Sequence, residues 1–64
     1  MDKKQFVLSV IEKVNSKKHC SKEEIETALS YLRELVSNGS HIGTKAYSMQ
    51  ISGLLVAALD KVSK

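Results

Sequence analysis

The stretch Ile51-Ser52-Gly53-Leu54-Leu55-Val56-Ala57-Ala58-Leu59 decides the fold, because as a helix it is apolar on nearly every side. Its one clearly polar residue is Ser52. A surface helix of a small monomer needs a single apolar stripe, so the rest of this helix requires cover. The simplest cover is a second copy of the chain. The stretch therefore predicts a small helical protein that binds another protein, in the first place itself.

The length of 64 residues predicts one domain, residues 1–64. Domains this small bury only ~60% of their unfolded surface and usually need disulfides, metal or oligomerisation as support. The single cysteine, Cys20, excludes an intrachain disulfide. His19, Cys20 and His41 lack the spacing of metal ligands, so we expect no metal and no cofactor. Oligomerisation, as a homodimer, is the expected support.

The charge and the apolar runs bear on location. The net charge of +3 by itself implies neither nucleic acid nor membrane as a partner. The first apolar run, Phe6 to Ile11, is short and no small-residue cleavage site follows it, so we expect no signal peptide. No run approaches the ~20 apolar residues of a membrane-spanning helix. We therefore expect a cytoplasmic protein that does not act at a membrane.

The pattern predicts an all-α fold, a three-helix bundle with helices at about residues 3–16, 22–38 and 44–62. Asp2 with Gln5 forms a capping pair for the first helix. Its valines and isoleucine make a strand the competing interpretation of Phe6–Ile11, but Phe6, Val10 and Val14 recur at helical spacing.

The second and third helices carry clear boundary signals. Ser21 and Glu24 form a capping box, in which the serine accepts from the N–H three residues on and the glutamate reaches back to the cap N–H. Asn38-Gly39 ends the second helix, since glycine adopts the left-handed conformation without steric cost. Thr44 is the expected cap of the third helix, and Ile42, in the connection, is expected to fold inward.

The third helix presents two apolar stripes. The first is expected to face the core and comprises Tyr47, Ile51, Leu54, Leu55, Ala58 and Val62. Gly53 permits close approach of another helix, either one of the same chain or one across a dimer seam. The second stripe comprises Met49, Val56 and Leu59 and lies roughly on the opposite side of the helix. The candidate dimer interface is Met49, Gly53, Val56, Ala57 and Leu59. The predicted core is Phe6, Val10, Ile25, Leu29, Leu32, Leu35, Ile51, Leu54, Leu55 and Ala58.

No enzymatic signature is present, so we expect no catalytic residues and no enzyme. Cys20 follows two lysines and precedes a helix, a setting that could lower a thiol pKa and make it redox-responsive. The alternative, which we favour, is an inert cysteine packed between helices.

A basic stretch surrounds the segment that joins the first and second predicted helices, here called the first connection. As a nucleic-acid contact it would neutralise phosphates. As a solvated surface, the interpretation we favour, it needs no partner. Arg33 is the only arginine, whereas arginine forks are the commonest specific readers of guanine. The candidate nucleic-acid contacts are Lys13, Lys17, Lys18, Lys22 and Lys45.

The joint pattern of the second and third helices resembles the small enterobacterial AriR-type proteins of biofilm development and acid resistance, over about residues 24–59. The positions that carry the resemblance are Leu32, Leu35, Gly39, Ile42, Lys45, Tyr47, Ile51 and Leu55. The resemblance implies an all-helical homodimer that regulates without catalysis, as a connector acting on a phosphorelay. It also implies a structural role for Lys45.

Together these features favour a small, non-enzymatic, bacterial or phage regulatory protein that acts by protein–protein contact. The connector role in stress or biofilm signalling is what the resemblance implies. Two alternatives stay open. One is a DNA-binding transcriptional regulator, and the other is a phage-type inhibitor of a host protein.

Overall fold

The computed structural model describes residues 2–63, which form three α-helices and, within that range, no strand. α1 spans Lys3–Asn15, α2 spans Lys22–Ser37 and α3 spans Lys45–Val62. The predicted all-α three-helix bundle is confirmed, and every helix boundary lies within one residue of its predicted place. None of the described helices is both long enough and apolar enough to cross a membrane.

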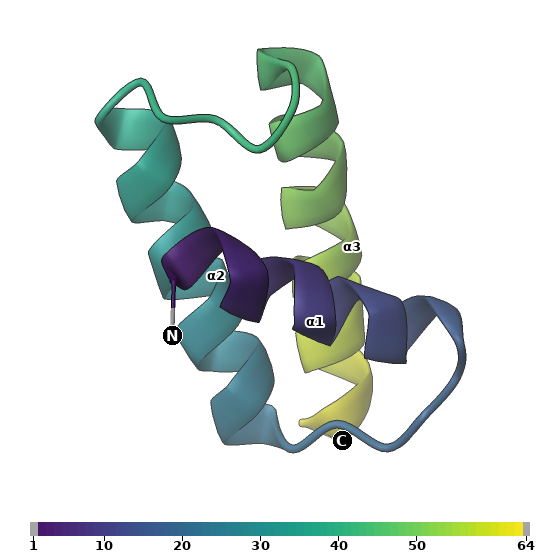
Figure 1. Ribbon diagram of the computed structural model, residues 1–64. Helices are drawn as coiled ribbons and strands as arrows, with labels where there is room; N and C mark the ends of the chain where they lie inside the picture. Colours follow the sequence, from purple (N-terminus) through teal and green to yellow (C-terminus); the bar gives the residue numbers. More distant parts are fainter. Residues whose placement is uncertain (1, 64) are drawn as a thin grey trace.

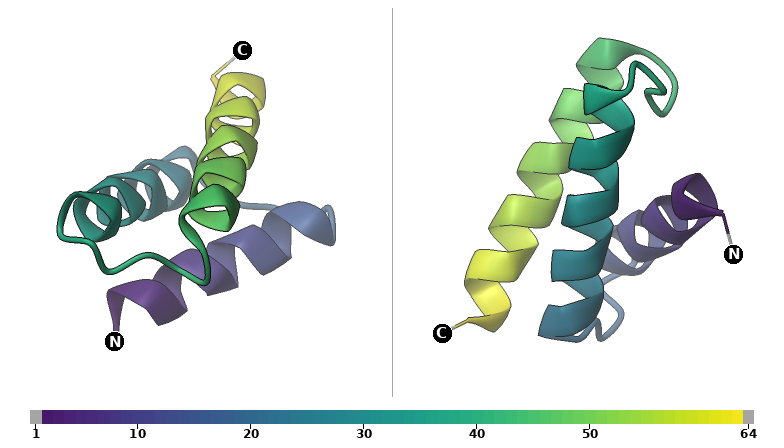
Figure 2. Two further views of the ribbon diagram at one scale, coloured as in Figure 1. Left: turned by 90° about the horizontal axis from the view of Figure 1, so that it is seen from above. Right: turned by 90° about the vertical axis from the view of Figure 1, so that its left-hand side faces the viewer.

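Two of the three helices pack side by side, and the third crosses them. α2 and α3 run antiparallel side by side, and α1 crosses one face of this pair (Figures 1 and 2). The opposite face of the α2–α3 pair carries no further helix in the described part of the chain (Figure 2). One face of the pair is therefore covered and the other is open.

Each helix begins at a side-chain cap that the sequence predicted. The Asp2 carboxylate accepts from the Lys4 N–H at 3.3 Å, Ser21 Oγ from the Glu24 N–H at 3.2 Å, and Thr44 Oγ1 from the Tyr47 N–H at 3.0 Å. These bonds satisfy N–H groups that have no partner inside the helix. The second half of the predicted capping box is wrong, because the Glu24 carboxylate turns instead to Lys13 and Cys20.

α1 and α2 end in the same hydrogen-bonded turn. After α2, the Ser40 N–H donates to the Leu35 carbonyl at 2.8 Å, and Gly39 has the predicted left-handed φ of 76°. After α1, the Lys18 N–H donates to the Lys13 carbonyl at 2.9 Å. The residue in the glycine position of this turn is Lys17, with φ 58°.

Six of the predicted core residues are buried, and three lie at the edge of the core. The buried ones are Val10, Ile25, Leu29, Leu32, Ile51 and Leu55, and the edge ones are Phe6, Leu35 and Ala58. The core also takes residues that the prediction left out: Val7, Ile11, Cys20 and Ala28. Ile42 is buried as expected.

The assignment of Leu54 to the core is wrong, since 38% of its surface is exposed. Consecutive residues of a helix differ by about 100° in direction, so Leu54 cannot share the inward direction of Leu55. Tyr47 and Val62, at the two ends of the same predicted stripe, are each 42% exposed. α1 crosses the pair well inside the ends of α3, so it leaves these flanking positions uncovered (Figure 1).

A buried serine fixes the connection between α2 and α3. Ser48 is fully buried, and its Oγ accepts from the Ile42 N–H and donates to the Ile42 carbonyl, both at 2.9 Å. This pair of bonds satisfies two backbone groups that burial removes from water. It also holds the Ile42 side chain in the end of the core.

Candidate functional site

The predicted dimer residues divide between the surface and the edge of the core. Met49 and Val56 are 63% and 48% exposed, Gly53 and Ala57 are also exposed, and Leu59 packs partly buried against the core. Met49, Gly53 and Val56 recur at i, i+4 and i+7, so they share one face of α3. This face is apolar and open to solvent.

Gly53 makes no close contact within the chain. A Cβ atom built on Gly53 would meet nothing within 4 Å. The interpretation in which Gly53 lets α1 or α2 approach α3 is therefore wrong. The interpretation in which it lies in a dimer seam stays a prediction.

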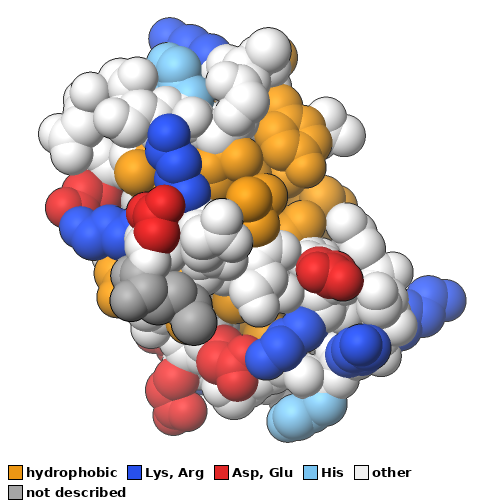
Figure 3. Space-filling model, in the orientation of Figure 1, with side chains coloured by type: hydrophobic (Ala, Val, Ile, Leu, Met, Phe, Trp, Pro, Cys, Tyr) orange, Lys and Arg blue, Asp and Glu red, His pale blue; other side chains and the backbone are white. Residues whose placement is uncertain are grey.

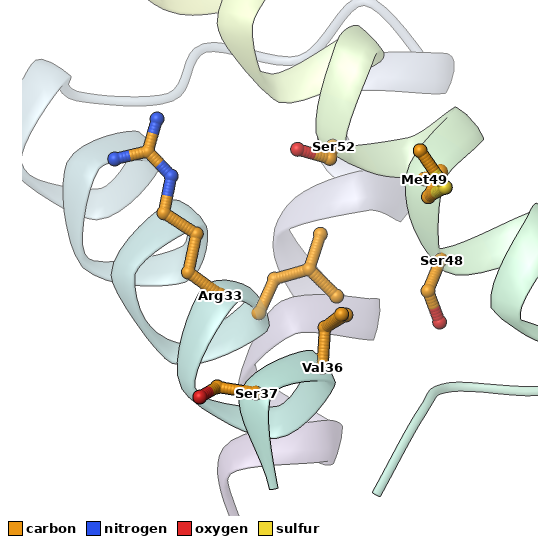
Figure 4. A pocket seen from close by; sticks show the side chains of 7 residues that line it. Arg33, Val36, Ser37, Ser48, Met49 and Ser52 are labelled. Carbon is orange, nitrogen blue, oxygen red and sulfur yellow. The ribbon is translucent and has the colours of Figure 1, made fainter. Parts of the chain in front are cut away.

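The open face of the α2–α3 pair carries a furrow, here called the open groove. Its first part is a hollow of about 310 Å³, with Arg33, Val36 and Ser37 on the α2 side and Ser48, Met49 and Ser52 on the α3 side (Figure 4). Its second part, about 340 Å³, is lined by Glu26, Leu29, Ser30, Arg33 and Leu59. Arg33 borders both parts, and no residue of α1 lines either. The groove thus belongs to the face that α1 leaves uncovered.

Two opposite charges border the open groove. Glu26 and Arg33 are exposed and lie seven residues apart on α2, which is about two helical turns or ~10 Å. Neither makes an ion pair within residues 2–63, where the ion pairs are Lys3 with Glu34 and Lys13 with Glu24. The groove therefore offers one free anion and one free cation beside an apolar floor.

A second concavity, here called the basic hollow, lies between the first connection and the C-terminal half of α3. It measures about 370 Å³, and its described lining contains no acidic residue. The floor is apolar, including the exposed Leu54 and Val62, and the cationic rim includes Lys17, Lys18 and Lys61. In Figure 3 blue side chains gather over this end of the molecule, at the lower right. The complete lining is Val14, Lys17, Lys18, His19, Cys20, Ile25, Leu54, Ala57, Ala58, Lys61 and Val62.

A small polar cluster lies beside the basic hollow. The Glu24 carboxylate accepts from Lys13 Nζ at 3.1 Å and from Cys20 Sγ at 3.3 Å. The hydrogen bond from Lys13, and then that from Cys20, lower the pKa of Glu24. Burial, and then the hydrogen bond to Glu24, raise the pKa of Cys20. The direction is opposite to the lowering that the neighbouring lysines could have caused, and Cys20 is buried between the helices, as in the interpretation that we favoured.

The structure places the predicted nucleic-acid contacts in different parts of the molecule. Lys13 is paired with Glu24, and Lys45 begins α3 at the end of the molecule opposite the first connection (Figure 1). Lys17 and Lys18 stay together at the rim of the basic hollow, while Lys22 is exposed in the first turn of α2. The sequence analysis missed Lys61, which joins the rim from the far end of the chain. Only the packing of α3 against the first connection reveals it.

No three His, Cys, Asp or Glu side chains among residues 2–63 come close enough together to hold a metal ion. No protein-family model matches the chain, and no curated protein or solved structure matches it significantly.

Proposed function

We propose that this chain is a non-enzymatic regulatory protein that acts by protein–protein contact and forms a homodimer through its open α2–α3 face. The observation that carries the proposal is the apolar, solvent-exposed face of α3 around Met49 and Val56, next to an uncovered groove. Exposed apolar surface that adjoins a groove and is rimmed by polar groups is typical of protein interaction sites.

Charge argues for a second copy as the occupant. In a two-fold symmetric dimer the same patch meets itself, so residue i faces residue j and j faces i. Two antiparallel α2 helices with the axis near Ser30 bring Glu26 of each chain opposite the partner's Arg33. The two free charges of the groove are thereby both satisfied. A partner without this spacing of opposite charges gains less from the same face.

Shape argues in the same direction. The bare backbone at Gly53 meets nothing in its own chain, so another helix can approach α3 closely there. Burying Met49 and Val56 would remove two large apolar side chains from water, each worth ~1.5–3 kcal/mol when fully buried. Small domains commonly need such support.

Light scattering over a range of concentrations tests the proposal. We expect the wild-type mass to be that of a dimer, and Val56→Glu to give a folded monomer because the dimer would bury an unpaired charge. Leu8→Glu is the matched control, since Leu8 is similarly exposed at 39% but lies on α1. A folded Val56→Glu variant that keeps the dimer mass would place the interface elsewhere.

A charge exchange tests the two-fold arrangement itself. Glu26→Arg and Arg33→Glu each bring like charges together and should weaken the dimer. The double variant, which exchanges the two charges, should restore it. Two separate losses without restoration would contradict the antiparallel pairing of the α2 helices.

The resemblance of residues 24–59 to AriR-type proteins supports a connector role in stress or biofilm signalling, and we include that role in the proposal. Its alternative, a DNA-binding regulator, predicts duplex affinity that falls steeply with salt. We expect little duplex binding at physiological salt, because Lys13 is already paired and the outer face of α3 is apolar rather than basic.

A further inference from the structure

We propose that the basic hollow binds an acidic amphipathic helix of a partner protein, an inference that rests on the proposed regulation by protein contact and names the class of partner. The hollow and the open groove have no lining residue in common. Of the candidate dimer residues, Ala57 alone lines the hollow, so a dimer formed around Met49 and Val56 on the open face leaves the other residues of the hollow accessible. Each chain then offers one face to its own copy and another to a target.

The floor of the hollow has the shape for a helix. Leu54, Ala58 and Val62 recur every four residues along α3, so they form one stripe about 12 Å long, which is two helical turns. Leu54 and Val62 expose 38% and 42% of their surface, while Val14 and Ala58 are half-buried beside them. A helix bound in a groove places apolar anchors at i, i+3, i+4 and i+7 over such a stripe.

The cationic rim of the hollow favours a bound helix that carries acidic residues beside its apolar ones. Lys17 and Lys18 border it from the first connection, and Lys61 borders it from α3. None of the three makes an ion pair within the described residues. Glu24, which lies beside the hollow, is already engaged by Lys13 and Cys20. Asp60 precedes Lys61 in the chain, but it does not line the hollow and makes no ion pair within the described residues. The lining of the hollow thus combines an apolar floor with lysines and holds no acidic residue, and carboxylates beside apolar anchors complement it.

The same geometry disfavours the two other anionic partners. A nucleic-acid duplex supplies phosphates but no apolar side chains for Leu54 and Val62. A lipid surface receives apolar groups that protrude from a helix face, whereas these line a concavity. An acidic amphipathic helix satisfies both the rim and the floor.

The backbone at the rim is consistent with this role. Lys17 keeps a left-handed φ of 58° in the turn where glycine is favoured. A strained residue of this kind often marks a functional position. Here it places a lysine at the rim of the hollow.

Fluorescence anisotropy tests the proposal with a labelled synthetic helix that carries leucines at i, i+3, i+4 and i+7 and glutamates beside them. We expect saturable binding by the full-length chain that weakens as salt rises. Lys18→Gln with Lys61→Gln should weaken binding about three- to tenfold, and Leu54→Ser should weaken it by a similar factor. The matched controls are Lys45→Gln and Leu8→Ser, which change an exposed lysine and an equally exposed leucine outside the hollow. Circular dichroism confirms that each variant is folded.

The contrary outcomes are distinct. No binding of the acidic helix at roughly millimolar peptide, or equal binding by the hollow variants and their controls, would overturn the inference. Equal binding of a peptide with lysines in place of the glutamates would also overturn it. Tighter binding of the chain to vesicles containing anionic lipid than to the acidic peptide would do the same. Because the peptide assay and the solution mass are measured separately, a monomer that binds the peptide contradicts only the dimer, and a dimer that ignores the peptide contradicts only this inference.

Discussion

Lys17 occupies a backbone conformation that costs a lysine more than a glycine. Its φ of 58° lies in the left-handed region. In this region the Cβ atom lies too close to the following carbonyl oxygen, which costs roughly 1–2 kcal/mol. We predict that Lys17→Gly raises the free energy of unfolding by up to about 1 kcal/mol, measured by urea denaturation. Lys18→Gly is the control and should not raise the free energy of unfolding, since Lys18 has no positive φ. A loss of stability in Lys17→Gly would show that the side chain itself stabilises the turn.

Glu24 makes the stability depend on acid pH. Its pKa is lowered in the folded chain from an ordinary value of 4.5, mainly by the hydrogen bond from Lys13. A lowered pKa adds stability above the unfolded-state value, and this stability is lost as the pH falls through the folded-state value. We therefore expect wild-type unfolding free energy to fall below about pH 4.5 more steeply than that of Glu24→Gln. Denaturant titrations at several pH values, with Glu23→Gln as control, measure the difference.

At the scale of the element, α3 carries a glycine that its own chain does not require. Gly53 is exposed, and an added Cβ would meet nothing within 4 Å. In a monomeric background such as Val56→Glu, we predict that Gly53→Ala raises the unfolding free energy by roughly 1 kcal/mol, the difference in helix propensity. Ala57→Gly should lower it by a similar amount. If Gly53→Ala destabilised this monomer, the backbone at Gly53 would have to contact another part of the same chain.

Also at this scale, the element boundaries followed from local signals, whereas the inward faces did not. Asp2, Ser21 and Thr44 each cap a helix within a few residues of sequence, so spacing alone predicted them. Leu54 was assigned to the core because it is apolar and lies on an apolar stripe. Its exposure depends on where α1 crosses α3, and no local pattern records that position.

At the scale of the whole molecule, the proposed dimer on the open face would make the stability depend on protein concentration. A dimer that forms only from folded chains raises the apparent stability by mass action, so its Tm depends on protein concentration. We predict that the Tm of the wild type rises with concentration, while that of Val56→Glu stays constant. Differential scanning calorimetry at widely separated concentrations measures both, and a constant wild-type Tm would speak against self-association.

The candidate sites also belong to this scale. The lysines of the first connection are adjacent in sequence, and their clustering was predictable from that fact. Lys61 joins them only because α3 ends beside the first connection. Glu24 likewise serves its own helix in the local pattern, but in the structure it binds Lys13 of α1 and Cys20 of the connection.

The sequence by itself determined the three helices, their caps, the left-handed glycine after α2 and the excess of apolar surface on α3, because each depends on residues within a few turns of one another. Only the tertiary structure decided which face of the α2–α3 pair stays open, which apolar residues reach the surface and which charges surround each concavity. Those features depend on how α1 crosses the other two helices, and contacts between distant segments fix that crossing.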